Sequence, residues 1–308
     1  MDARRREAHR ARIRAGCPAA ALGAVILALG VVLGGLGCAS DRRARSETVT
    51  ADQLNRRREA SRIAQAAADA GDWPAARQAL QALVAEAPRS AEAHHRLGQA
   101  LAAEGQLEAA EAAYRRALDL DPEYPSALVG LAEVESRLGR LQAALGHLDQ
   151  AIELDPRRPE AHLTRGQTLE ALGRGPDALA AYFRALQYDP NCRLALIRVA
   201  ALQIDANHPE QALLRLAQVF EANPNDPDAH HQRGRARLRI GDVTGAIADL
   251  QRAADQLPDR AEIQYDLALA LSATEPPRRE DAARAAQRAA ELAPAWAEAH
   301  TLHQHLTR

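Results

Sequence analysis

Residues 91–124 read AEAHHRLGQALAAEGQLEAAEAAYRRALDLDPEY and predict two helices joined by a tight turn. Apolar residues recur at helical spacing up to Gly105, and again through Ala110, Tyr114 and Leu118 until the chain reaches Asp121-Pro122. Glycine permits the turn and proline cannot continue a helix, so the stretch forms one helical hairpin. A hairpin of this size cannot bury its own apolar face and needs neighbours of the same kind.

The same pattern recurs every 34 residues along the chain. The terminal prolines are Pro88, Pro122, Pro156, Pro190, Pro224 and Pro258, and Pro294 follows two residues late. The turn residues are Gly71, Gly105, Gly139, Gly173, Asn207 and Gly241. The small residues of the second helix are Ala76, Ala110, Ala144, Ala178, Ala212, Ala246 and Ala282. Glycine and asparagine tolerate a positive φ best, so the turn place predicts a left-handed backbone.

A 34-residue hairpin with a small residue at its eighth place, a turn glycine, an alanine in the second helix and a terminal proline resembles the tetratricopeptide repeat. The resemblance covers residues 57–294 and implies an all-α fold, a right-handed α-α solenoid of about seven repeats. The repeats are expected at 57–90, 91–124, 125–158, 159–192, 193–226, 227–260 and 261–296. Residues 297–308 are more polar and are expected to form a capping helix.

The N-terminal region predicts export from the cytoplasm. Residues 1–16 are rich in arginine, residues 19–36 form an uncharged apolar run, and Cys38 follows Gly37. This pattern resembles a bacterial lipoprotein signal, which implies cleavage before Cys38 and lipidation of that residue. An uncleaved membrane anchor and an ordinary cleaved signal are the alternatives. All of them place the repeats in the cell envelope, with 1–37 as signal or anchor, 38–49 as a polar tether and 50–308 as the solenoid.

Composition and motifs argue against several classes of function. Residues 1–37 hold six of the 39 basic residues and two of the 41 acidic ones, so residues 38–308 carry a net charge of −6. A mildly acidic solenoid is a poor nucleic-acid binder. The three cysteines have no disulfide or metal-ligand spacing, and no catalytic motif occurs. We therefore expect no enzyme activity, no cofactor and no metal site.

Histidines recur at the fourth place of alternate repeats, where the family often has an aromatic residue. They are His94, His162, His230 and His300. Residues two repeats apart lie too far from each other to share one metal ion, whose ligands sit about 2 Å away. We interpret these histidines as helix-packing residues.

In the family, the second, fifth, ninth and twelfth places of each repeat line a concave groove. This implies an apolar floor in the third to fifth repeats, with basic shoulders at either end. The predicted partner-binding residues are Arg62, His95, Arg96, Val129, Leu163, Ile197, Arg198, His231, Arg235 and Tyr265. Such a groove suits a peptide with apolar side chains and some acidic ones. The alternative is that part of the apolar stripe only packs between neighbouring helices.

The groove places of the repeat at 91–124 are polar, so we expect that repeat to be peripheral to binding. The resemblance implies a protein-interaction scaffold that brings a partner protein or peptide to the membrane, as in assembly of an envelope complex such as the type IV pilus. The alternative is a regulatory or adaptor subunit of an envelope enzyme, such as a peptidoglycan hydrolase.

Overall fold

The structure is a computed structural model that describes residues 50–308. These residues form fifteen helices and no strand. The predictions for residues 1–37, for the lipidation of Cys38 and for the tether at 38–49 lie outside the described residues.

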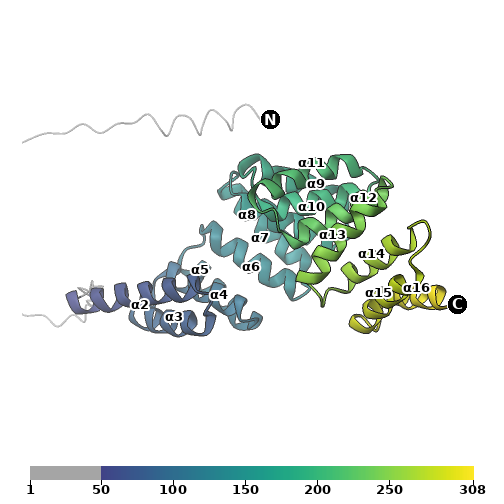
Figure 1. The fold of residues 1–308 in the computed structure, drawn as a ribbon. Coiled ribbons are helices and arrows are strands. Elements are labelled where there is room, and N and C mark those ends of the chain that lie inside the picture. Colours follow the sequence, from purple (N-terminus) through teal and green to yellow (C-terminus); the bar gives the residue numbers. More distant parts are fainter. Residues whose placement is uncertain (1–49) are drawn as a thin grey trace, which may run out of the picture. The chain divides into compact units, whose positions relative to one another are not determined.

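Consecutive helices pack as antiparallel pairs, one pair for each repeat (Figure 1). We call the first helix of each pair helix A and the second helix B. The A helices are α2 (Ala51–Asp69), α4 (Ala91–Ala103), α6 (Pro125–Arg137), α8 (Pro159–Ala171), α10 (Arg193–Asp205), α12 (Pro227–Arg239) and α14 (Ala261–Ser272). The B helices are α3 (Trp73–Glu86), α5 (Leu107–Leu120), α7 (Leu141–Leu154), α9 (Gly175–Tyr188), α11 (Pro209–Ala222), α13 (Val243–Gln256) and α15 (Arg279–Leu292). The odd helix α16 (Ala297–Thr307) packs on α15 and ends the array.

Each helix B also packs against helix A of the next repeat. Several neighbouring A helices contact each other as well, and α6 lies against both α4 and α8. The predicted all-α solenoid with a capping helix is therefore confirmed.

The turns inside the repeats have the predicted left-handed backbone. All five turn glycines have a φ between 72° and 85°, and Asn207 has a φ of 61°. In the repeat at 91–124 the amide of Gln106 donates to the carbonyl of Leu101 at 2.9 Å, which closes the end of helix α4 around Gly105. At the other end of the array, Thr50 caps α2 and Gln53 bonds back to the Thr50 amide, as the sequence predicts.

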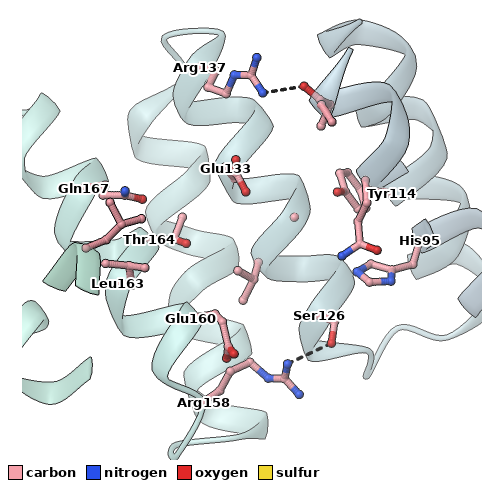
Figure 2. A pocket seen from close by; sticks show the side chains of 16 residues that line it. His95, Tyr114, Ser126, Glu133, Arg137, Arg158, Glu160, Leu163, Thr164 and Gln167 are labelled. Atoms are coloured by element: carbon pink, nitrogen blue, oxygen red, sulfur yellow. Dashed lines mark hydrogen bonds between the residues drawn. The ribbon is translucent and has the colours of Figure 1, made fainter. Parts of the chain in front are cut away.

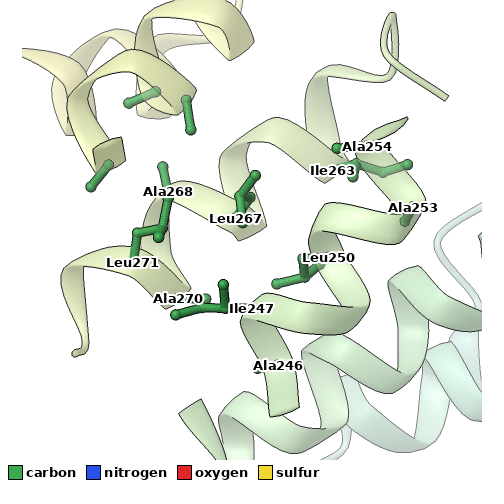
Figure 3. Close-up of a cluster of buried hydrophobic side chains, with 13 residues drawn as sticks. Ala246, Ile247, Leu250, Ala253, Ala254, Ile263, Leu267, Ala268, Ala270 and Leu271 are labelled. Atoms are coloured by element: carbon green, nitrogen blue, oxygen red, sulfur yellow. The ribbon is translucent and has the colours of Figure 1, made fainter. Parts of the chain in front are cut away.

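Small residues hold the two helices of each repeat together. The predicted alanines of helix B are all 0% exposed, including Ala282 after the longer last turn. The apolar core continues between repeats, as Figure 3 shows for Leu250 of α13 beside Ile263 and Leu267 of α14. A solenoid core of this kind is a row of such interfaces between neighbours.

The histidines at the fourth place bond to the terminal prolines. Nε2 of each lies 3.0–3.1 Å from the carbonyl oxygen of the proline six residues earlier. The pairs are His94 with Pro88, His162 with Pro156, His230 with Pro224, and His300 with Pro294. Each histidine thus fixes the loop that joins two repeats, a structural role.

Within residues 50–308 no helix combines the length and the apolar character needed to cross a bilayer.

Candidate functional site

The A helices of four consecutive repeats form a pocket of about 580 Å³ (Figure 2). Its walls come mainly from α4, α6 and α8, with Tyr114 from α5 and Leu194 from α10. Most lining residues occupy the groove places named above, such as His95, Val129 and Leu163 at the fifth place. The pocket is therefore the central part of the predicted groove.

Tyr114 reaches this pocket because Gly98 and Gly130 have no side chains. A Cβ atom on Gly98 would lie 2.8 Å from the Tyr114 ring, and one on Gly130 would lie 2.5 Å from it. The ring passes between α4 and α6 through this space and is 3% exposed. Burial, together with the negative charge of Glu133, raises the pKa of Tyr114, so its hydroxyl keeps the proton.

His95 is the most perturbed titratable group of the predicted site. Its ring is 9% exposed and packs against the rings of Tyr114 and Tyr124, with centroids 5.7 and 5.1 Å away. Burial, reinforced by the positive charge of Arg158, lowers the pKa of His95 to about 4. The imidazole is therefore neutral at pH 7.

The predicted apolar floor is largely covered. Val129 is 9% exposed and Ile197 is 5% exposed, and both belong to core clusters between repeats. Leu163 is half-buried and lines the pocket, and Leu194, at 43% exposed, adds the most apolar surface. The accessible apolar part of the groove is thus narrower than the sequence indicates.

Most arginines of the predicted basic shoulders form ion pairs with carboxylates. Arg198 makes two bonds to Glu170, of 2.8 and 2.6 Å. Arg235 donates to Asp205 at 2.7 Å, and Arg62 to Glu59 at 2.6 Å. Arg96 instead donates to two neutral oxygens, Oγ of Ser61 at 2.8 Å and Oε1 of Gln65 at 3.0 Å. These arginines therefore offer less free positive charge than their number implies.

The two remaining predicted residues are held by their neighbours. Nε2 of His231 lies 2.7 Å from a carboxylate oxygen of Asp266, and His231 is 5% exposed. Tyr265 packs on Trp296, with ring centroids 4.7 Å apart. Neither lies in the central pocket, which gathers only His95, Val129 and Leu163 of the ten predicted residues.

The repeat at 91–124, expected to be peripheral, supplies one wall of the pocket. His95, Gln99 and Tyr114 all line it. Sequence reasoning missed Tyr114 because it lies on helix B, where groove residues are not expected. The signal was available, since Tyr114 stands sixteen residues after Gly98, at a place where four of the seven repeats have alanine. A glycine there together with a tyrosine predicts a ring packed on the backbone.

The ionic cluster around Asp249 is a closed network. Asp249, 1% exposed, accepts bonds from His230 at 2.9 Å, Arg233 at 2.7 Å and Arg237 at 2.8 Å. No group of three or more potential metal ligands occurs in the part of the chain that the structure describes.

Comparison with known proteins agrees with this geometry. Two sequence profiles of the tetratricopeptide repeat match residues 61–125 and residues 101–167 and 169–238, more than half of the chain. The chain belongs to the tetratricopeptide-repeat family. The curated proteins include no match.

Several solved structures share the fold. The Cut9–Hcn1 hetero-tetramer of the APC/C has a TM-score of 0.72 at 15% identity, and the match covers 80% of this chain and 48% of that one. PilF of Pseudomonas aeruginosa has a TM-score of 0.60 at 19% identity over 70% of this chain and 96% of its own. PilW, a type IV pilus biogenesis factor, has a TM-score of 0.59 at 19% identity over 69% of this chain and 97% of its own. At these identities the likeness is one of fold.

Proposed function

We propose that this tetratricopeptide-repeat protein is a non-catalytic scaffold that binds an extended segment of a partner protein in the groove of its A helices. The pocket of about 580 Å³ at the groove places of α4, α6, α8 and α10 carries this proposal. The A helices are held rigidly by the repeat core, so the groove is preorganised and a peptide loses less free energy to ordering of the site on binding. Leu163 and Leu194 supply the apolar contact.

The scaffold acts at the bacterial cell envelope, attached through its N-terminal region. The support is the arginine-rich segment, the apolar run and the cysteine at 38 in the sequence. Attachment would raise the local concentration of the bound partner at the membrane. Mass spectrometry of the mature chain tests this: a lipid mass on Cys38 is expected, and an intact Met1 would contradict lipidation.

The similarity of fold to PilF and PilW makes assembly of a type IV pilus or a related envelope machine a candidate process. Crosslinking in native membranes would identify the partner. A photoreactive residue at Leu194 is expected to capture it, while one at Leu214, 71% exposed on α11 and outside the pocket, serves as the control. An assembly component and an envelope hydrolase are different captured proteins, so the same experiment separates the two functions.

A matched pair of substitutions tests the groove itself. Leu194→Asp places a charge in the pocket, whereas Leu214→Asp makes the same change at an exposed leucine outside it. We expect the first to lose partner capture and the second to retain it, both with unchanged circular dichroism. Capture that survives Leu194→Asp would contradict binding in this groove.

A further inference from the structure

Two largely buried residues of the central pocket have hydroxyl groups without an internal partner. Tyr114 is 3% exposed and Thr164 is 7% exposed, and both line the pocket (Figure 2). Neither side-chain hydroxyl forms a hydrogen bond with any residue in the range 50–308. The two oxygen atoms keep some accessible surface and face the pocket. They are therefore free to bond to a ligand that enters the pocket and displaces water.

Two carboxylates on the same pocket also lack a cation. Glu133 of α6 and Glu160 of α8 line it, and in the described range neither has a basic group within 4.0 Å. This contrasts with Glu170 and Asp205 farther along the groove, which are paired with arginines. Glu133 and Glu160 are therefore free to pair with a cation of a bound partner.

The two arginines of the pocket are already engaged. Arg158 bonds to Oγ of Ser126 at 3.0 Å and lies 3.3 Å from the carboxylate of Asp155. Arg137 donates to the carbonyl of Ala102 at 2.8 Å (Figure 2). Each arginine thus has a partner already, although Nε of Arg158 makes no hydrogen bond within residues 50–308. The carboxylates of Glu133 and Glu160 and the hydroxyls of Tyr114 and Thr164 make none in that range, and all of these groups can accept hydrogen bonds.

We propose that this pocket is a subsite for a basic side chain, arginine or lysine, of the bound partner segment. The cationic group lies between Glu133 and Glu160 and donates to the hydroxyl oxygens of Tyr114 and Thr164. Its methylene stem packs on Leu163, as long basic side chains do on apolar surfaces. A neighbouring apolar residue of the segment covers Leu194, which is 43% exposed. The subsite rests on the proposed groove function and reverses the acidic partner that the sequence indicates.

A displayed library of random ten-residue peptides, selected on the full chain in detergent, tests the subsite. We expect the enriched peptides to share one arginine or lysine beside an apolar residue. Replacing that arginine with neutral citrulline should weaken binding to the native chain at least tenfold. The same replacement should change the affinity for the Glu133→Gln, Glu160→Gln double variant by less than threefold, because this variant lacks the carboxylates that pair with the guanidinium group.

The control variant carries Glu210→Gln and Glu221→Gln, two exposed glutamates of α11. It should retain the full preference for arginine over citrulline, and the preference of the native chain should shrink as salt screens the charges. Peptides that bind the native groove but lack a basic residue, or that bind the double variant equally well, would overturn the subsite. Peptides that bind Leu194→Asp as tightly as the native chain would overturn the proposed groove function instead. A selection that enriches nothing would overturn both.

Discussion

Replacing Gly166 with alanine tests how closely the two helices of a repeat must approach. A Cβ atom at this position would lie 2.5 Å from the ring of Tyr182, which is 0% exposed and whose hydroxyl is bonded to Glu170. Alanine gains about 0.5–1 kcal/mol over glycine in a helix, but overpacking a core costs about 1–3 kcal/mol. Gly166→Ala should therefore destabilise the protein by about 1 kcal/mol.

The matched control is Gly146→Ala in α7. That glycine is exposed, and a Cβ there would have no atom within 4 Å, so only the gain in helix propensity remains. Urea denaturation followed by circular dichroism should thus move the midpoint down for Gly166→Ala and up for Gly146→Ala. Equal or opposite shifts would refute the reasoning.

A second substitution should relieve the crowding. Other repeats of this chain combine alanine at the eighth place with leucine where Tyr182 stands, as in Ala132 with Leu148. In the background of Tyr182→Leu, Gly166→Ala should cost at least about 1 kcal/mol less than it does alone. A cost that is independent of the tyrosine would place the strain elsewhere.

Three further predictions concern single residues. Asp249→Asn should destabilise the protein by about 3 kcal/mol in urea, because it leaves Arg233 and Arg237 without their buried counter-charge. Burial alone would raise the pKa of Asp249, but the bonds from Arg233 and His230 outweigh it and hold the pKa below its usual value, so this contribution is lost as the pH falls. The pKa of His95 is about 4 in the folded state, below its ordinary 6.5, so the folded state binds fewer protons than the unfolded state between these two values. Lowering the pH from 7.5 to 5 should therefore reduce the free energy of unfolding by about 2 kcal/mol. The His95→Asn variant should not show that part of the loss. Asn207→Ala should cost about 1 kcal/mol in thermal or urea unfolding and Asn207→Gly nothing, because the φ of 61° disfavours alanine.

The features that the sequence predicted well depend on the chain close by. The left-handed turn at Gly105, the cap at Thr50 and the burial of Ala110 each follow from a few neighbouring residues. Their recurrence in register makes each prediction stronger than any single motif could. The bond from His162 to the carbonyl of Pro156 has the same local origin, since the two residues keep a fixed separation of six, and the sequence therefore contained it as well.

The candidate site depended on contacts between repeats, which no local pattern records. Arg198 stands at a groove place and counts as free positive charge in the sequence, yet Glu170, 28 residues earlier, neutralises it. Glu133 counts as an ordinary surface carboxylate, yet it borders a pocket and has no basic group of the described residues within 4.0 Å.

The available charge of a solenoid groove is therefore set by pairs of residues about one repeat apart. Arg96 reaches back 35 residues to Ser61, and Arg235 reaches back 30 to Asp205. A residue at a groove place can serve a partner only where the neighbouring repeat leaves it unpaired. In this chain that condition selects Glu133 and Glu160 over the arginines, so the chemistry of the groove follows from which side chains the adjacent repeats fail to satisfy.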